Sequence, residues 1–417
     1  MSDVVKGNAV IGQSGGPTAV INQSVVGVIE AVAGFDAVDR LLGARHGVRG
    51  MVDEDFVPLD GLDAGRLARI AATPGAALGS TRDKPDDEYC RKIFQVFEKH
   101  KVRYFFYIGG NDSAGTANIV NDLANEAKYE LRVFHIPKTI DNDLLVTDHA
   151  PGFGSAAKFV ASAVMGDDRD NASLPGIKIN VIMGRNAGWL TAASVLARRE
   201  EGDGPHLIYV PERVFDVDRF IEDVRATVGR LGRCQVAVSE GIVCDEEMEV
   251  HKDDGSVKRV PKPVAVKVAE EMGIPLERDR HDNIILSKLP LGQFLADYLE
   301  KGVGKKKLRI RSDTFGYLQR SFAGCVSPVD ASEAREVGRK AVELAMSGDV
   351  DGSVAIRRTG AGGDYAGEFF RAELADVATG TRPLEEEYVG EDGNDVRESF
   401  RDYAAPLAGE LPVIAKL

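Results

Sequence analysis

The 417-residue sequence lacks paired cysteines, long apolar runs and an excess of basic residues. Its four cysteines show no CxxC spacing and no histidine at zinc-finger distance, which indicates free thiols of a reducing compartment. No run approaches the ~18 apolar residues of a membrane span, and the first residues have neither the basic end nor the apolar stretch of a signal peptide. Lys and Arg number 52 against 66 Asp and Glu, so the net charge of −14 excludes general attraction to nucleic acid or to an acidic membrane. We expect a cytoplasmic protein in which an anionic substrate needs a local basic pocket.

The chain has room for two or three domains at ~150 residues each, and its 45 glycines exceed ordinary usage. Short apolar runs alternate with longer amphipathic stretches, which is the pattern of an α/β fold with a mainly parallel sheet. Strands are predicted at 9–11, 104–108, 131–136, 177–183, 207–210 and 235–238. Helices are predicted at 87–100, 187–199, 217–231, 291–300 and 331–346.

Two segments differ in composition from the rest of the chain. Residues 245–262 are charged and have no core period, which predicts an exposed loop or hairpin inserted after a strand. From about residue 361 the chain is rich in Gly, Glu and Asp, and GAGGDYAGEF predicts a loop before a terminal helix.

Glycine-rich turns that also carry polar residues follow the predicted strands 9–11 and 104–108. The first turn, at 12–19, contains Gly15 and Gly16, whose backbone can approach an anion at a helix start, although it matches neither a P-loop nor a GxGxxG fingerprint. The second turn places a Gly-Gly pair before Asn111, Asp112 and Ser113. A helix cap would explain one polar residue there, whereas the glycine pair indicates close approach to a ligand.

The third turn follows the strand 131–136 and places Lys138 beside Asp141 and Asp143. Two carboxylates at i and i+2 would repel each other unless a cation or a proton-transfer role keeps them there, which predicts a magnesium-phosphate site with a general base. An Asx turn with exposed acids would explain the same residues. Three such turns at successive strand ends favour the active site, because ligands bind at that edge of a parallel sheet.

Seven segments, taken in order, resemble the phosphofructokinase family from about residue 8 to about residue 350: SGGPTAVIN (14–22), LGSTR (78–82), GGNDS (109–113), PKTIDND (137–143), MGRNAGWLT (183–191), SEGI (239–242) and GYLQR (316–320). The resemblance implies two similar three-layer α/β/α domains with mainly parallel sheets and the active site in the cleft between them. It implies a phosphoryl-donor domain at 1–151 plus about 319–370, and a sugar-phosphate domain at 152–318 plus about 371–417.

The resemblance also implies a reaction, the Mg²⁺-dependent transfer of a phosphoryl group to the 1-hydroxyl of fructose 6-phosphate. Asp141 matches the catalytic base and Asp143 matches the acid that helps to hold Mg²⁺, with Asp112 expected as a further Mg²⁺ ligand. The remaining implied residues are Gly15, Gly16, Arg82, Gly110, Asn111 and Ser113 for the donor, and Thr139, Met183, Gly184, Arg185, Glu240, Arg311, Tyr317 and Arg320 for the sugar phosphate. Because the arginine matched by Arg311 often reaches the phosphate across a subunit interface, a homodimer or homotetramer is expected.

Two residues bear on the identity of the donor. Relatives that use ATP usually have glycine at the position of Asp112, where a carboxylate fills space and repels the α-phosphate of a nucleotide. The combination of Asp112 and Lys138 resembles the pyrophosphate-dependent group of the family. The resemblance implies that both residues are catalytic. One departure is Asn111, which stands where the family commonly has a metal-binding Asp and leaves the exact Mg²⁺ ligands open.

Three alternatives to the pyrophosphate-dependent enzyme stay open on the sequence. An ATP-dependent 6-phosphofructokinase would share every segment quoted above. A non-catalytic regulatory subunit of the family would keep the fold and lose the base, whereas Asp141, Asp143, Arg185 and Glu240 are all present. A nicotinamide-dependent oxidoreductase would share the α/β pattern, but its fingerprint is missing from the first turn.

Overall fold

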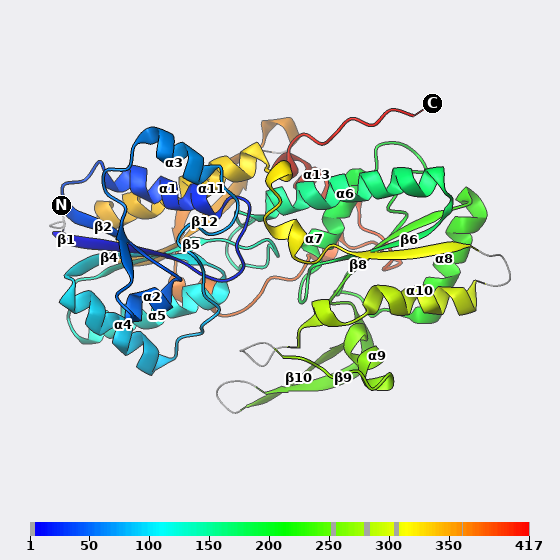
Figure 1. Ribbon diagram of the computed structural model, residues 1–417, viewed down its shortest axis with the longest axis horizontal. Helices are drawn as coiled ribbons and strands as arrows, with labels where there is room; N and C mark the ends of the chain where they lie inside the picture. Colours follow the sequence, from blue (N-terminus) through cyan, green and yellow to red (C-terminus); the bar gives the residue numbers. More distant parts are fainter. Residues whose placement is uncertain (1–4, 252–255, 279–283, 304–307, 361, 417) are drawn as a thin grey trace. The chain divides into compact units, whose positions relative to one another are not determined.

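The computed structural model describes residues 5–251, 256–278, 284–303, 308–360 and 362–416. The chain divides into two compact units that exchange segments. Unit 1 comprises Met1–Ala156, Arg320–Arg382 and Pro406–Gly409, and unit 2 comprises Ala157–Gln319, Pro383–Ala405 and Glu410–Leu417. Each unit therefore combines stretches that lie far apart in the sequence (Figure 1).

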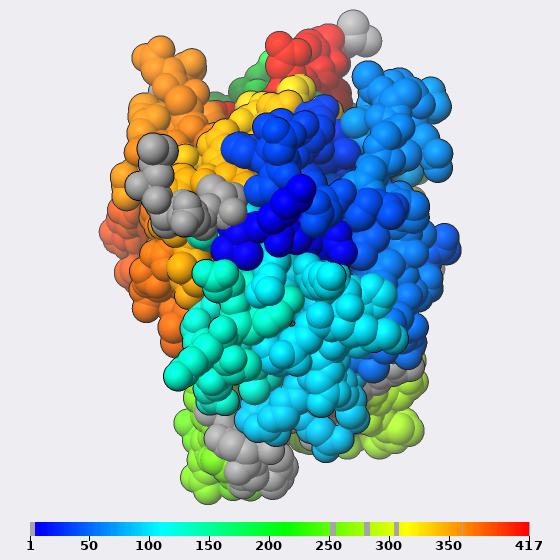
Figure 2. All heavy atoms as spheres, turned by 90° about the vertical axis from the view of Figure 1, so that its left-hand side faces the viewer, coloured from blue at the N-terminus to red at the C-terminus, as the bar shows by residue number. Residues whose placement is uncertain are grey.

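Unit 1 is built on a seven-stranded sheet. Its strands are β1 Gly7–Gln13, β2 Val38–Ala44, β3 Phe56–Pro58, β4 Val102–Gly109, β5 Arg132–Pro137, β12 Asp351–Thr359 and β13 Ala366–Ala372. They lie in the order β13-β12-β5-β4-β1-β2-β3, with the five central strands parallel and the two edge strands antiparallel to their neighbours. Figure 2 shows orange segments of the later chain on the same face as the blue and cyan N-terminal segments.

Helices cover both faces of this sheet (Figure 1). They are α1 Ile21–Val32, α2 Val48–Val52, α3 Ala64–Ala71, α4 Asp87–Lys99, α5 Asn111–Glu126, α11 Pro328–Ser347 and α12 Leu374–Ala378. Alternate side chains of β4 enter opposite layers: Tyr104 and Phe106 pack with α1 and α11, whereas Phe105 and Tyr107 pack with α4 and α5. Because both faces are buried, β4 is a continuous apolar run without a polar alternation.

Unit 2 contains a smaller sheet of four parallel strands, in the order β11-β6-β8-β7. These strands are β6 Gly176–Ile182, β7 Leu207–Tyr209, β8 Cys234–Ser239 and β11 Arg309–Thr314, and a separate antiparallel pair is formed by β9 Val243–His251 and β10 Val257–Pro263. The helices are α6 Phe153–Ser173, which starts in unit 1, α7 Trp189–Ala192, α8 Val217–Leu231, α9 Val264–Glu271, α10 Leu291–Gly302 and α13 Glu398–Ala408, which ends in unit 1.

The two faces of the smaller sheet differ in chemistry. On one face, Ile179 and Val236 join an apolar cluster with Phe220 of α8. On the other face, the Gln235 side chain donates to the Val164 carbonyl of α6 at 3.1 Å and to Asn180 Oδ1 at 3.0 Å. Each unit is thus a three-layer α/β/α arrangement, and the fold class predicted from the sequence is confirmed.

Most elements predicted from the sequence are confirmed, including all six strands and the helices at 87–100, 217–231, 291–300 and 331–346. The charged insertion at 245–262 forms the β9–β10 hairpin, although residues 252–255 lie outside the described residues. Among the described residues, no helix has both the length and the apolar character required to cross a membrane.

Two predicted elements are wrong. The single helix at 187–199 is instead the short α7 followed by a 3₁₀ turn over Ala193–Ala197. Every residue of both is buried, so the segment lacks the solvent face of an amphipathic helix. The predicted loop after residue 361 contains β13, which pairs antiparallel with β12 and places Phe369 opposite Ile356. Ala361 itself lies outside the described residues.

Candidate active site

Three turns that the sequence singled out meet in unit 1 at the carboxyl ends of parallel strands. Lys138, directly after β5, donates through Nζ to the Gly16 carbonyl oxygen in the β1–α1 turn at 2.7 Å. Its backbone N–H donates to the carbonyl of Gly109, at the end of β4, at 2.9 Å. Gly15 has a φ of +72°, and a Cβ there would lie 3.1 Å from Lys138 Nζ. The lysine therefore joins all three turns at the sheet edge where α/β folds bind ligands.

A cluster of cations surrounds the β1–α1 turn. Lys138 is only 3% exposed, and burial, with the nearby charges of Arg82 and Arg320, lowers its pKa to about 7 against the opposing effect of Asp141 and Asp143. A Cβ on Gly16 would lie 2.6 Å from Nη1 of Arg320, which the sequence assigned to the sugar phosphate. The structure thus places Arg320 at the β1–α1 turn, where it adds to a local positive potential within an acidic chain.

The β4–α5 turn is held by serine hydroxyls. Ser14 Oγ and Ser113 Oγ lie 2.5 Å apart, and Ser14 Oγ donates to the Ile108 carbonyl at 3.0 Å. A Cβ on Gly109 would lie 2.0 Å from Ser113 Oγ, so only glycine allows this close approach. Gly110 follows as a partly buried residue that caps α5.

Asp112 is exposed at the start of α5 and forms an ion pair with Lys84, with 3.2 Å between Oδ1 and Nζ. The Asn111 side chain accepts a hydrogen bond from the Asp112 backbone N–H at 2.9 Å. The predicted acid of the donor site is therefore on the surface of this turn and partly neutralised by a cation from the loop that also carries Arg82.

The Thr139 hydroxyl links the two acidic residues of the third turn, through the backbone of Asp141 and the carboxylate of Asp143. Thr139 Oγ1 accepts from the Asp141 backbone N–H at 3.1 Å and donates to Asp143 Oδ1 at 3.5 Å. Burial and the charge of Asp141 raise the pKa of Asp143 above its usual range. Asn142 separates them with a φ of +55° and accepts from the Ala150 N–H at 3.0 Å.

This pair suits a hard divalent cation, because a cation would stabilise two ionised carboxylates that otherwise repel each other. Within the described ranges, no group of three or more His, Cys, Asp or Glu side chains is arranged to hold a metal ion. Oxygens from outside the protein, such as those of a phosphate group, would have to complete the coordination of an ion here.

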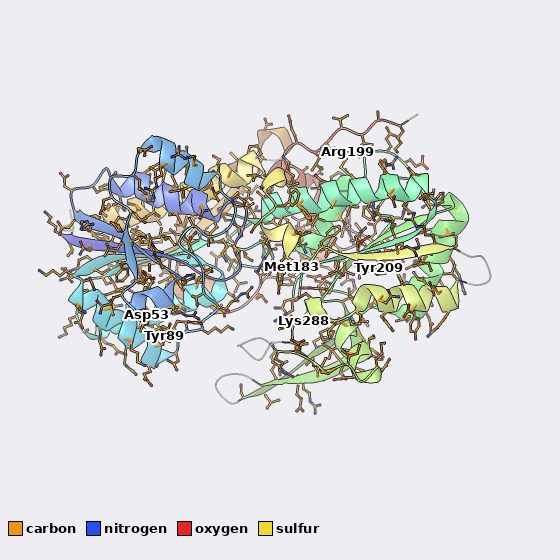
Figure 3. All side chains as sticks on the ribbon, viewed as in Figure 1. Asp53, Tyr89, Met183, Arg199, Tyr209 and Lys288 are labelled. Atoms are coloured by element: carbon orange, nitrogen blue, oxygen red, sulfur yellow. The ribbon has the colours of Figure 1, made fainter. Side chains whose placement is uncertain are left out.

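The residues predicted to bind the sugar phosphate form a second group in unit 2. Met183, labelled in Figure 3, Gly184 and Arg185 follow β6, and Glu240 follows β8. Ser239 Oγ donates to the Gly184 carbonyl at 2.6 Å, and the Glu240 N–H donates to the Ile182 carbonyl at 2.8 Å. Gly184 has a φ of +147°, so the turn after β6 requires glycine.

The other predicted sugar-site residues are more open. Arg311 lies exposed on β11 and donates through Nη1 to the Ile310 carbonyl at 2.7 Å, while Tyr317 is 56% exposed. Arg185 donates through Nη2 to the Ile284 carbonyl at 3.0 Å. Thr139 belongs to unit 1, together with Asp141 and Asp143.

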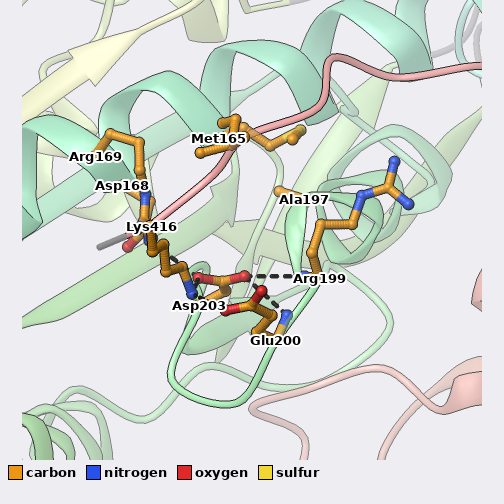
Figure 4. A pocket seen from close by; sticks show the side chains of 9 residues that line it. Met165, Asp168, Arg169, Ala197, Arg199, Glu200, Asp203 and Lys416 are labelled. Atoms are coloured by element: carbon orange, nitrogen blue, oxygen red, sulfur yellow. Dashed lines mark hydrogen bonds and ion pairs between the residues drawn. The ribbon is translucent and has the colours of Figure 1, made fainter.

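A small pocket in unit 2 contains none of the predicted site residues (Figure 4). It is lined by Met165, Asp168, Arg169, Ala197, Arg199, Glu200, Asp203, Ile414 and Lys416. Lys416 Nζ lies 2.5 Å from Asp203 and 3.0 Å from Glu200, so these charged side chains of the pocket already pair with each other.

Sequence reasoning missed Arg382, which lies in unit 1 after α12. Its guanidinium donates to the carbonyls of Thr147 at 2.9 Å and Asp148 at 2.6 Å, within the loop that begins at Asp141. Nothing in the local sequence TGTRPLEE distinguishes this arginine from a surface residue.

Glycine turns, cations and paired carboxylates at the ends of parallel strands suit an enzyme that acts on phosphate groups, and the family model and relatives below identify it as a phosphotransferase. The chain belongs to the phosphofructokinase family, whose sequence model matches residues 8–345. The family resemblance seen in the sequence is confirmed, and family membership indicates a requirement for a divalent cation.

Individual relatives cover almost the whole chain. A Rhodospirillum rubrum protein named pyrophosphate–fructose 6-phosphate 1-phosphotransferase is 51% identical over 405 residues, which are 97% of this chain and 95% of the relative. A Halomonas elongata protein of the same name is 35% identical over 98% of this chain and 96% of its own length. The solved structure of a pyrophosphate-dependent phosphofructokinase from Marinobacter aquaeolei is similar with a TM-score of 0.82, at 30% identity, over 99% of this chain and 94% of that one.

Proposed function

We propose that the protein transfers a phosphoryl group from pyrophosphate to the 1-hydroxyl of fructose 6-phosphate, giving fructose 1,6-bisphosphate and phosphate. The reaction runs in either direction and serves glycolysis or gluconeogenesis in the cytoplasm. Relatives that share 51% and 35% of their aligned residues carry this activity in their names. The observation in this chain that carries the proposal is the buried Lys138 seated on the Gly16 carbonyl, beside Arg82 and Arg320.

A small polyanion matches this cation cluster. Pyrophosphate carries several negative charges on a compact body, and charge-assisted hydrogen bonds from lysine and arginine are the strong kind. The carboxylate of Asp112, at the start of α5, opposes a longer nucleotide donor by its charge and its volume. We therefore favour pyrophosphate over ATP, with Gly15, Gly16, Gly110, Asn111 and Ser113 forming the donor turns.

The acids of the third turn supply the chemistry at the sugar hydroxyl. Asp141 accepts the proton of the 1-hydroxyl as the oxygen attacks phosphorus, and phosphate leaves. Asp112 and Asp143 would hold Mg²⁺, which neutralises charge on the donor when it is bound. Lys138 donates to the donor oxygens and orients them, since phosphoryl transfer depends mainly on positioning and electrostatic stabilisation.

Unit 1 is the proposed donor domain and unit 2 the proposed sugar-phosphate domain. Thr139, Met183, Gly184, Arg185 and Glu240 bind the sugar phosphate. Tyr317 and Arg311 bind its 6-phosphate, with Arg311 contributed by a second copy of the chain. Arg320, which the sequence assigned to the same phosphate, is proposed for the donor instead, because its Nη1 lies beside Gly16. The protein is accordingly a homodimer or a homotetramer.

The decisive experiment measures phosphorylation of fructose 6-phosphate with pyrophosphate and with ATP side by side, each with Mg²⁺ and after chelation. We expect turnover with pyrophosphate that stops on chelation and returns with added Mg²⁺, and a much lower rate with ATP. A higher kcat/KM with ATP would contradict the choice of donor. Inactivity with both donors would contradict the proposed reaction.

A further inference from the structure

Arg382, which follows α12, contacts the loop that carries the two acids. Its backbone N–H donates to the Asp143 carbonyl at 2.8 Å. Its guanidinium donates to three further carbonyls, those of Thr147 at 2.9 Å, Asp148 at 2.6 Å and Asn142 at 3.3 Å. A single residue thus contacts four carbonyls within the loop Asp141–Ala150.

This loop has no regular secondary structure to satisfy its own backbone. Buried carbonyls need donors, and the planar guanidinium fork supplies several in fixed directions. The loop also contains two residues with positive φ, Asn142 at +55° and Val146 at +70°. Such a conformation is unusual for a β-branched valine and persists only where the surroundings hold it.

The far end of the loop, where Arg382 contacts only the Asp148 carbonyl, has further anchors of its own. The Asp148 carboxylate lies 3.2 Å from Arg358 Nε on β12, and His149 Nε2 lies 2.7 Å from Glu333 on α11. Asn142 and Thr147 have polar contacts besides those with Arg382: the Asn142 side chain accepts from the Ala150 N–H at 3.0 Å, and Thr147 Oγ1 accepts from the Ile356 N–H of β12 at 2.9 Å. At the acid-bearing end, Arg382 adds the donors for the carbonyls of Asn142, Asp143 and Thr147.

We propose that Arg382 is a positioning residue that holds the Asp141–Thr147 end of the loop, and so the carboxylates of Asp141 and Asp143, in the geometry for phosphoryl transfer. The inference rests on the proposed function for its kinetic consequence. The residue lies outside the region matched by the family model, which ends at residue 345. A C-terminal extension of the fold thus completes the catalytic loop.

The test compares Arg382→Ala and Arg382→Lys with the wild type and with Arg357→Ala. Arg357 is an exposed arginine of the same unit, paired with Glu368 at 3.2 Å, so its loss controls for removal of a surface charge. We expect kcat of Arg382→Ala to fall about 100-fold with KM for both substrates changed less than about threefold, because misplacement of a catalytic group by about 1 Å costs this much. Lysine keeps the charge but not the fork, so Arg382→Lys is expected to lose about tenfold.

A second measurement does not depend on activity. Amide hydrogen exchange is expected to accelerate in Arg382→Ala over 141–147, with little change over 148–152, where the Asp148 and His149 contacts remain. Unchanged exchange over 141–147, or kcat within about twofold of the wild type in a folded Arg382→Ala protein, overturns the inference. Where the alanine variant does not fold, Arg382→Lys decides by the same two criteria. Inactivity of the wild type itself contradicts the proposed function, and the exchange data then judge the positioning role alone.

Discussion

Lys138 Nζ and the Gly16 carbonyl oxygen lie 2.7 Å apart, so a buried lysine links the end of β5 to the β1–α1 turn. Replacement by methionine keeps the apolar stem and removes the donor. We expect kcat/KM for pyrophosphate to fall about 100-fold, the effect of losing ~3 kcal/mol from hydrogen bonds to a charged group. Steady-state kinetics check this, with Lys92→Met as the control, since Lys92 only pairs with Glu88 on the surface of α4. Equal effects of the two substitutions would remove Lys138 from donor binding.

The same lysine predicts a pH dependence. Burial and the charges of Arg82 and Arg320 lower its pKa to about 7 in the free protein. Because only the protonated amine attracts an anion, kcat/KM for pyrophosphate should decline as pH rises through about 7. Lys138→Arg should move this decline to higher pH, because arginine stays charged. A profile of kcat/KM against pH that is unchanged in the arginine variant would assign the decline to the substrate.

Asp141 is expected to be essential for turnover and dispensable for binding. Asp141→Asn keeps the shape and removes the base, so kcat should fall by about 10²–10⁴-fold, the usual contribution of general base catalysis. Calorimetric titration should show fructose 6-phosphate bound with nearly unchanged affinity. Asp122→Ala, an exposed acid on α5, serves as the control. Near-normal turnover of the asparagine variant would exclude Asp141 as the base.

Asp112 is expected to discriminate between donors. Asp112→Gly removes a carboxylate and its volume from the start of α5, so ATP-dependent turnover should appear or rise by about tenfold, as expected when ~1.4 kcal/mol of repulsion is removed. Lys84→Met leaves the carboxylate and removes only its partner at 3.2 Å, and should bring no gain with ATP. Parallel assays with both donors distinguish the two variants. Absence of any ATP-dependent rate in Asp112→Gly would show that other residues exclude the nucleotide.

His149 is expected to make stability depend on pH. Burial alone would lower the pKa of His149, but hydrogen bonds to Asp148 and Glu333, and their charges, raise it to about 9 from 6.5. The Tyr365 hydroxyl also lies 3.3 Å from His149 Nε2, and Arg358 pairs with Asp148 at 3.2 Å. The folded state binds the proton more tightly, so its stabilisation is full below pH 6.5 and is lost as pH rises through about 9.

Urea unfolding at a series of pH values checks this expectation. The free energy of unfolding should fall by about 1–3 kcal/mol between pH ~6.5 and ~9.5 in the wild type. His149→Gln, which cannot titrate, should be less stable at neutral pH and should show a smaller change over the same range. An equal decline in both proteins would assign the pH dependence to other groups.

The sequence predicted the parallel strands because each is a continuous apolar run bounded by glycine or polar turns. The run at 104–108 became β4, buried on both faces by helices. Residues 187–199 were mispredicted as one helix because helix propensity does not report burial on all sides, which only the packing around Trp189 supplies. The strand β13 was missed because the hydrogen bonds that stabilise it come from β12, and this pairing is visible only in the folded structure.

In the candidate site, too, some residues could be predicted from the sequence and others only from the structure. Residue types and spacing alone indicated Lys138, Asp141 and Asp143, because their chemistry stands within one short segment of the sequence. The position of Arg320 beside Gly16 and the role of Arg382 depend on contacts between residues hundreds of positions apart, which no local pattern encodes. By itself, the sequence determined the α/β class and the family, and it predicted the acids and cations of the candidate site. The tertiary structure decided which cations surround the β1–α1 turn and which side chain donates to the carbonyls of the loop after Asp141, because electrostatic and hydrogen-bond energies depend on distance in space and not on separation along the chain.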